Sequence, residues 1–259
     1  MDQIKGINKD KIKEIVSSHG FDSDLILKDY YITAILYLLK DIKGIYFKGG
    51  TALQKIFLNY SRLSEDIDFT VTGDVKKIKK MITNIIEESK LFNRVTKDKD
   101  VEKFTRLIVC YTGFSNEEDK IFIDLNKRAK LLLKPEIHKI PHFYKEDIPE
   151  FSIKTLNFKE LVAEKMAAAI GRNKPRDHFD LYKIIENKIP IDIKLVKKKC
   201  KTSSYDFNIV KIFHKANKLK NRWDKDMTPL IRDNVEFKDV MQTLAKYFKY
   251  KEEKKKLKK

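Results

Sequence analysis

The sequence has few of the residues that build disulfide or zinc frameworks. Only two cysteines, Cys110 and Cys200, occur among its 259 residues, and they form no CxxC pair. A disulfide scaffold or a zinc knuckle is therefore not expected, and a reducing compartment fits better. The eight glycines and six prolines are scattered along the chain, so no low-complexity linker separates its parts.

Long apolar runs are missing as well. The sequence contains no stretch of about 18 apolar residues, the length that a membrane-spanning helix needs. The first ten residues, MDQIKGINKD, lack the charged start and apolar run of a signal peptide. We therefore expect a soluble, cytoplasmic protein with no membrane partner.

The sequence does contain enough apolar material for a core, together with a large positive charge. Hydrophobic residues make up 42% and aromatic residues 11%, which argues against global disorder and allows one large domain or two small ones. The net charge is +18, and residues 194–225 carry eleven Lys or Arg against two Asp. This concentration favours a nucleic-acid partner. The basic tail, residues 249–259, either extends such a surface or is a solvated chain end.

Hydrophobic periodicity predicts an α+β protein with two lobes. Residues 1–155 alternate between helical and strand patterns, which predicts an N-terminal domain with a mixed sheet. Beyond residue 155 the apolar spacing is helical almost to the end, so residues 156–259 are expected to form a helical, basic C-terminal lobe. Expected helices of the first lobe cover residues 25–39, 51–60 and 76–91, and expected strands cover 44–47, 67–71, 104–111 and 120–125.

Residues 48–69, KGGTALQKIFLNYSRLSEDIDF, combine a glycine turn with paired acids. Alternation along a strand puts Asp66 and Asp68 on the same face. Two carboxylates on one strand face, near a Gly-Gly-Thr turn that opens a helix, suit Mg²⁺ and a triphosphate. The alternative interpretation is a solvated acidic end of a strand.

The glycine turn, the helix after it and the Asp-x-Asp strand together resemble the nucleotidyltransferase superfamily of polymerase β. The resemblance implies that the glycines let backbone amides approach phosphate oxygens and that the carboxylates hold divalent metal. In that superfamily a third acid usually comes from a later strand of the same sheet. Asp124 stands alone in the apolar strand 120–125 and is the candidate. The alternatives for Asp124 are a strand-end cap and an ion pair.

Three segments narrow the resemblance further. KGGTAL, SRLSEDIDF and, at residues 160–182, ELVAEKMAAAIGRNKPRDHFDLY resemble the AbiEii-type nucleotidyltransferase toxins, which include the MenT proteins. The resemblance implies that Asp180 is a catalytic acid of the second lobe, supported by Arg176 and Asp177. It also implies that the Ser64 hydroxyl lies beside the nucleotide phosphates, where antitoxins phosphorylate some members. The implied catalytic residues are Asp66, Asp68, Lys165 and Asp180; the implied nucleotide-binding residues are Gly49, Gly50, Thr51, Ser64 and Lys165; and the metal ligands are Asp66, Asp68 and Asp124.

Several of these positions also allow a structural interpretation. Lys165 could extend along a helix edge to water, and Asp177 could be a helix N-terminal residue favoured by the dipole. Arg62 could contact phosphate or lie at the surface. Arg172 and Lys174 could contact substrate from the loop between the two motif helices. Three histidines, expected to be structural or exposed because they show no metal-ligand spacing, are His138, His142 and His178.

The resemblance implies an Mg²⁺-dependent enzyme that transfers NMP from an NTP to an RNA acceptor, expected to be the 3′ end of tRNA. It would be the toxin of a toxin–antitoxin system, with a possible cognate antitoxin. Two other classes stay open. The acceptor could be a protein hydroxyl or a small molecule, although the basic charge argues against a cationic drug. The chain could also be a catalytically inactive, basic RNA-binding module.

Overall fold

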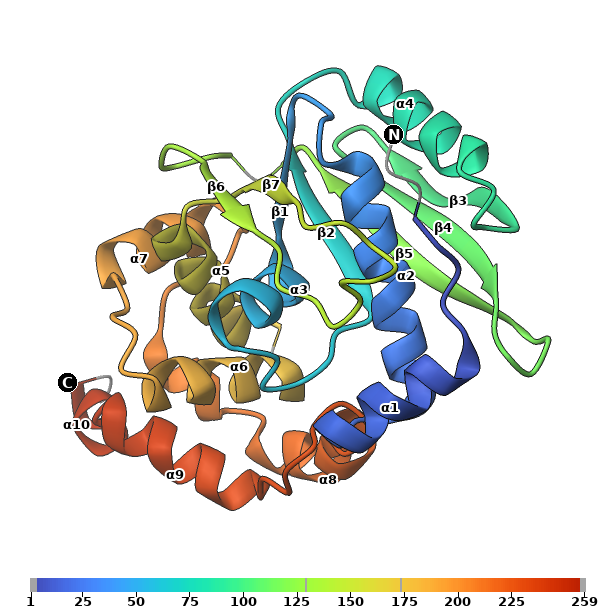
Figure 1. Cartoon of the computed structure of the whole chain (residues 1–259). Coiled ribbons are helices and arrows are strands. Elements are labelled where there is room, and N and C mark those ends of the chain that lie inside the picture. The colour runs from blue at the N-terminus through green and yellow to red at the C-terminus, as the bar shows by residue number, and fades with distance from the viewer. Residues whose placement is uncertain (1–3, 129, 173, 257–259) are drawn as a thin grey trace. The chain divides into compact units, whose positions relative to one another are not determined.

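The computed structural model describes residues 4–128, 130–172 and 174–256. The chain divides into two compact units, Met1–Asn157 and Phe158–Lys259, called unit 1 and unit 2 below (Figure 1). Of the predicted basic tail, residues 257–259 lie outside the described residues. Within the described ranges, no helix is long and apolar enough to cross a membrane.

Unit 1 is built on a mixed, seven-stranded sheet with the order β3-β4-β5-β2-β1-β7-β6 (Figure 1). β2 pairs antiparallel with β1 and parallel with β5, so both strand directions meet at the centre of the sheet. The predicted α+β class is confirmed. The strands are β1 (Ile45–Lys48), β2 (Asp66–Val71), β3 (Arg94–Val101), β4 (Phe104–Thr112), β5 (Glu118–Asn126), β6 (Glu136–Lys139) and β7 (Ser152–Thr155).

One face of the central strands forms the core of unit 1. Ile67 of β2 and Ile123 of β5 are register partners, and both are fully buried. The long helix α2 (Ser23–Leu39) covers this face, because the Tyr31 ring lies 4.2 Å from the ring of Tyr111, which alternation along β4 places on the same side (Figure 1). The acids of β2 and β5 therefore project from the opposite face of the sheet.

Two further helices of unit 1 are α1 (Lys9–His19) and α4 (Val75–Glu88). Their N-cap residues are Asn8 and Asp74, whose side chains accept hydrogen bonds from backbone N–H groups of the first turn. The helix predicted over 51–60 is instead a short α3 (Gly49–Ala52) that runs into one π-helical turn, η1 (Leu53–Phe57). It ends earlier because Asn59 and Tyr60 adopt positive φ.

Strand β3 was not predicted from the sequence. Its residues, RVTKDKDV, include five charged ones, and the side chains along it are almost all exposed. Because neither face of the strand is apolar, the period-two pattern that reveals a strand is missing. The pairing of β3 with β4 along its length therefore defines the strand, and burial contributes little.

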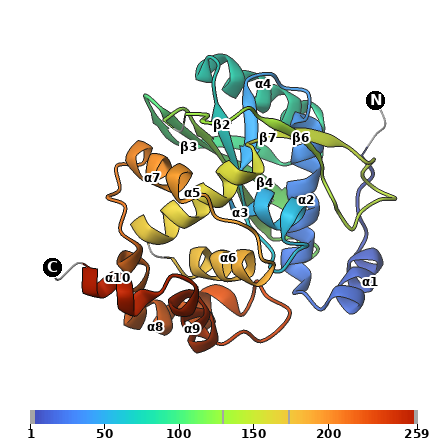
Figure 2. The same cartoon turned by 90° about the vertical axis from the view of Figure 1, so that its left-hand side faces the viewer.

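The regular structure described in unit 2 is helical throughout, as expected. α5 packs beside α6 and α7 (Figure 2). Between residues 209 and 227 the helical structure is divided into a 3₁₀ helix and α8. Unit 2 contains 28 Lys and Arg against 14 Asp and Glu, so it carries +14 of the chain's net charge of +18. Its elements are α5 (Phe158–Gly171), α6 (Pro175–Glu186), α7 (Ile193–Thr202), η2 (Ile209–Phe213), α8 (Ala216–Met227), α9 (Phe237–Tyr247) and α10 (Tyr250–Lys256).

Candidate functional site

The glycine turn lies directly against the paired acids. Lys48, the last residue of β1, is the register partner of Asp68 on β2, so the turn begins beside that carboxylate. Gly49 has φ +79°, and a Cβ atom on it would lie 2.0 Å from Asp68 Oδ2. A side chain at this position would therefore both strain the backbone and displace the carboxylate. A Cβ on Gly50 would lie 2.8 Å from Nη2 of Arg62.

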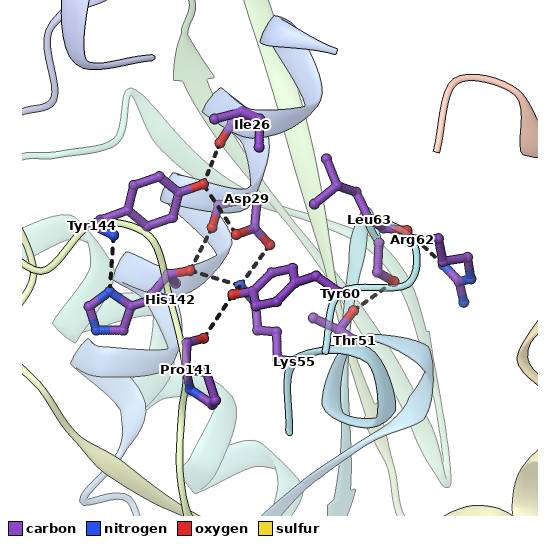
Figure 3. Close-up of polar contacts among 12 residues, drawn as sticks. Ile26, Asp29, Thr51, Lys55, Tyr60, Arg62, Leu63, Pro141, His142 and Tyr144 are labelled. Carbon is purple, nitrogen blue, oxygen red and sulfur yellow. Dashed lines mark hydrogen bonds and ion pairs between the residues drawn. The ribbon is translucent and has the colours of Figure 1, made fainter. Parts of the chain in front are cut away.

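Hydrogen bonds fix the turn to the start of β2. The buried Thr51 hydroxyl donates to the carbonyl oxygen of Asp66 and lies 2.8 Å from the Ser64 hydroxyl. Arg62 is buried as well, and its Nη1 donates to the carbonyl oxygen of Leu63 at 2.8 Å (Figure 3). Arg62 is therefore not the surface residue that one interpretation of the sequence allowed. The structure brings the predicted nucleotide-binding residues of unit 1 together around one turn.

Three carboxylates share the sheet face opposite the core. Asp66 and Asp68 are half-buried neighbours on β2, and Asp68 is the register partner of Asp124 on the parallel strand β5. Asp124 is held by Arg106 of β4, whose Nε and Nη2 donate to its two carboxylate oxygens at 2.7 Å each. The hydrogen bonds to Asp124 and the negative charges nearby raise the pKa of the Arg106 guanidinium. The ion-pair alternative for Asp124 is therefore present in the structure, and its role as a metal ligand remains a prediction.

The donor set on this face fits a hard divalent cation. Asp66, Asp68 and Asp124 offer carboxylate oxygens, the ligands that Mg²⁺ prefers. The Asp68 carboxylate packs directly against Gly49. Any side chain at position 49 would occupy the space that this carboxylate needs. Among the residues described, no three His, Cys, Asp or Glu side chains converge as a metal site. Asp124 would have to leave Arg106 to join the other two acids.

Unit 2 contains the second group of predicted site residues. Nζ of Lys165, on α5, lies 2.7 Å from Asp180 Oδ2 and 3.1 Å from Asp177 Oδ1, both on α6. Lys165 is only 6% exposed and the two acids are fully buried. Lys165 does not extend to water along a helix edge, so that interpretation is wrong. Lys165 and Asp180, both implied by the resemblance to be catalytic, are in direct contact.

Asp177 is a buried member of this cluster. Burial alone would raise its pKa, but the charge of Lys165 and the hydrogen bonds from Arg172 hold the pKa of Asp177 well below its usual range. Arg172 donates through Nε and Nη2 to both oxygens of Asp177, at 2.7 and 2.8 Å. The interpretation of Asp177 as a mere helix N-terminal residue is therefore wrong. Arg172 pairs with Asp177, and Lys174 is exposed ahead of α6; a substrate contact of either residue stays a prediction.

The three histidines have structural contacts, as expected. Nε2 of His138 lies 2.9 Å from Oε2 of Glu136. His142 accepts a hydrogen bond from the backbone N–H of Tyr144 at 3.3 Å. His178 is fully buried, with its ring nitrogens 3.0 and 2.8 Å from the carbonyl oxygens of Lys174 and Ile212.

Sequence reasoning missed a buried polar cluster behind the glycine turn (Figure 3). Nζ of Lys55, on η1, lies 2.6 Å from Oδ1 of Asp29, on α2, and donates to the hydroxyls of Thr33 and Tyr60. The Tyr144 hydroxyl lies 3.2 Å from Asp29 Oδ2. Burial lowers the pKa of Lys55 although Asp29 opposes that change. Helical spacing from Leu53, Ile56 and Phe57 puts Lys55 on the polar side of the expected helix, so no local pattern signals its burial.

A glycine turn packed against paired acids on a mixed sheet defines a nucleotidyltransferase-type domain. The family model described as the nucleotidyl transferase AbiEii toxin, type IV toxin–antitoxin system, matches residues 34–249. The match covers most of the chain, and the protein therefore belongs to the AbiEii family of nucleotidyltransferase toxins. The resemblance seen in the sequence motifs is confirmed.

Solved structures share this fold at low sequence identity. MenT4, a nucleotidyltransferase toxin from Mycobacterium tuberculosis, is similar with a TM-score of 0.68 and 20% identity, over 95% of this chain and 89% of that one. JHP933 from Helicobacter pylori is similar with a TM-score of 0.59 and 17% identity, over 91% of this chain and 96% of that one. No curated protein matches the chain significantly.

Proposed function

We propose that this toxin transfers NMP from an NTP to an RNA acceptor, the 3′ end of tRNA, in the cytoplasm. The observation that carries the proposal is the packing of the Asp68 carboxylate against Gly49, which joins the acids and the phosphate-binding turn in one place. The net charge of +14 on unit 2 supports a polyanionic acceptor, since phosphate contacts dominate nucleic-acid affinity.

The residues of the chain divide the chemistry among them. Asp66 and Asp68 would hold Mg²⁺, which neutralises charge on the triphosphate when it is bound. The backbone of the Gly49–Thr51 turn and the Ser64 hydroxyl orient the phosphates. The 3′-hydroxyl of the acceptor loses its proton to water as its oxygen bonds to the α-phosphorus. The bond from that phosphorus to the bridging oxygen breaks, and pyrophosphate leaves. Lys165 stabilises the charge on the leaving group, and Asp180 orients Lys165.

The ion pair between Lys165 and Asp180 supports these two roles. A lysine held at 2.7 Å by a buried carboxylate has a fixed ammonium position. A preorganised charge stabilises a developing negative charge without reorganising during the reaction. Asp177 contacts the same lysine, as the family resemblance suggested, and Arg172 holds Asp177 in place.

Purified protein incubated with total tRNA and each labelled NTP in parallel tests the proposal. We expect label in tRNA from at least one nucleotide, and its loss in Asp66→Ala. Asp41→Ala is the matched control, because Asp41 is an exposed acid of the same unit that belongs to no predicted site. The proposal is wrong if the wild type labels no RNA with any NTP. Label in a protein band instead would establish a protein hydroxyl as the acceptor.

A further inference from the structure

The Arg106–Asp124 pair lies on the sheet face that carries the candidate metal ligands. Arg106 and Asp124 are register partners on the antiparallel strands β4 and β5. The two bonds of 2.7 Å use both carboxylate oxygens, in the parallel fork geometry that makes Arg–carboxylate pairs strong. The Asp124 side chain is 13% exposed and that of Arg106 is 29% exposed, so water screens the pair only in part.

The surroundings of Arg106 fix its guanidinium over this face. Its central carbon lies 4.9 Å from the ring centre of Phe122, and Phe122 is the β5 register partner of Asp66. Asp66 adds to the attraction that raises the pKa of Arg106, after the larger contribution of Asp124. The guanidinium therefore belongs electrostatically to the same set of carboxylates that would receive a divalent cation.

A cation at Asp124 and a guanidinium at Asp124 oppose each other in two ways. The fork occupies both oxygens of a carboxylate that would otherwise be a third ligand beside Asp68. The positive charge of Arg106 also repels a second positive charge on the same face. No three carboxylates converge within the described ranges, as expected while Asp124 stays with Arg106.

We propose that Arg106 and a divalent cation compete for Asp124. Arg106 holds the third carboxylate when no metal is bound, and binding of the metal through Asp66, Asp68 and Asp124 releases Arg106 from it. The strength of the Arg106–Asp124 pair then sets the metal concentration at which the site fills. This inference depends on the proposed function only in requiring that the face bind a divalent cation.

Mn²⁺ titration of the full chain without nucleotide, followed by the electron paramagnetic resonance signal of free Mn²⁺, tests the competition. We expect Arg106→Gln to lower the dissociation constant about tenfold, the scale of one lost charge-assisted bidentate pair. Arg94→Gln is the matched control, because Arg94 pairs with Glu118 on the same sheet but is 59% exposed. It removes the same charge and should leave Mn²⁺ affinity unchanged.

An Asp124→Asn background separates competition from simple charge repulsion. There, Arg106→Gln should no longer tighten Mn²⁺ binding, because the contested ligand is gone. An equal gain in both backgrounds would show that Arg106 acts only through its field. A dissociation constant in Arg106→Gln equal to or weaker than the wild-type value, including no binding by either protein, would overturn the proposal.

Chemical modification of the wild-type protein tests the same step without relying on a variant to fold. Phenylglyoxal modifies accessible guanidinium groups, and mass spectrometry reports each arginine separately. Mn²⁺ should increase the modification rate of Arg106 severalfold and leave that of Arg94 unchanged; an unchanged rate at Arg106 contradicts release. Failure of RNA labelling with intact Mn²⁺ competition would reject only the proposed function. Transfer activity with no change of Mn²⁺ affinity in Arg106→Gln would reject only this inference.

Discussion

Two buried lysines, Lys55 in unit 1 and Lys165 in unit 2, have similar contacts and different predicted roles. Lys55 is 2% exposed and pairs with one carboxylate, Asp29, at 2.6 Å, while hydroxyl groups complete its hydrogen bonds. Lys165 lies between two fully buried carboxylates, Asp177 and Asp180. The first cluster therefore balances one positive charge with one negative charge. The second places two negative charges around Lys165, and Arg172 balances the surplus.

Burial and an acidic partner are common to both lysines, so these two features alone do not identify a catalytic lysine. Lys55 donates to the hydroxyls of Thr33, on α2, and Tyr60, after η1 (Figure 3). Its partner Asp29 also accepts from the Tyr144 hydroxyl. Such a closed network joins distant parts of the chain and specifies how they pack. Lys165 belongs to the motif segment 160–182 that resembles the toxin family, whereas Lys55 lies outside the three motif segments. Substitution of each lysine tests whether Lys55 is structural and Lys165 catalytic.

The largest effect is expected for Lys55→Met, a loss of about 3–5 kcal/mol in unfolding free energy, because it leaves Asp29 buried without its cation. Urea unfolding followed by circular dichroism measures the loss. The double variant Asp29→Leu/Lys55→Met removes both charges and should recover part of the stability. The RNA-labelling activity of the folded single variant should stay near the wild-type value. A double variant no more stable than Lys55→Met would show that the hydroxyl contacts, and not the charge pair, hold the cluster together.

Lys165→Met should lower the transfer activity far more than Lys55→Met does. We expect kcat to fall at least about 100-fold, roughly 3 kcal/mol of transition-state stabilisation, as for other preorganised charges at a reacting phosphate or carbonyl. Its stability should also fall, because the fully buried Asp180 loses the ammonium at 2.7 Å, while Arg172 still pairs with Asp177. Steady-state RNA labelling and urea unfolding of the same preparation measure both quantities. A near-wild-type kcat would make Lys165 a structural lysine like Lys55 and remove the contrast between them.

The sequence predicted the parts of the site that depend on local pattern or on family motifs. The shared face of Asp66 and Asp68 follows from alternation along a single strand. The motif segment that contains Lys165 and Asp180 indicated both as site residues, and the structure shows that they are in contact. The pairing of Arg106 with Asp124 depends on the register of two strands, which no local pattern encodes.

The buried pair of Asp29 and Lys55 was missed for a related reason. The two residues lie on separate helical segments, and each looks like an ordinary surface charge in its own window of sequence. Only the packing of η1 against α2 buries them together. Strand β3 escaped prediction because its charged residues hide the period-two pattern. The fold class was therefore predictable, whereas contacts between distant elements required the structure.

A pH-dependent effect should follow from His142, beside the Lys55 cluster. Burial, and then the charge of Lys55, lower the pKa of His142 from 6.5 to about 4. Between pH 6.5 and about pH 4 the unfolded chain binds a proton at His142 more readily than the folded chain does. The stability contributed by His142 is therefore complete above pH 6.5 and is lost as the pH falls toward 4. The loss amounts to up to about 3 kcal/mol.

Urea unfolding of the wild type and of His142→Gln between pH 4 and pH 7 measures this contribution. Gln keeps an acceptor for the backbone N–H of Tyr144 but does not titrate in this range. The variant should therefore lose less stability than the wild type as the pH falls. Parallel curves for the two proteins would show that other groups carry the pH dependence.

The smallest single effect is expected for Arg172→Gln, about 1 kcal/mol or less of stability, because the Arg172 side chain is 49% exposed and water screens its charge. Lys165 still neutralises Asp177 in this variant. In the Lys165→Met background the same substitution should cost more, since Asp177 would then be a fully buried carboxylate without either cation. A double-mutant cycle by urea unfolding measures this coupling. Additive losses would mean that Asp177 needs neither cation specifically, and that the Lys165 cluster, unlike the Lys55 cluster, tolerates an unpaired acid.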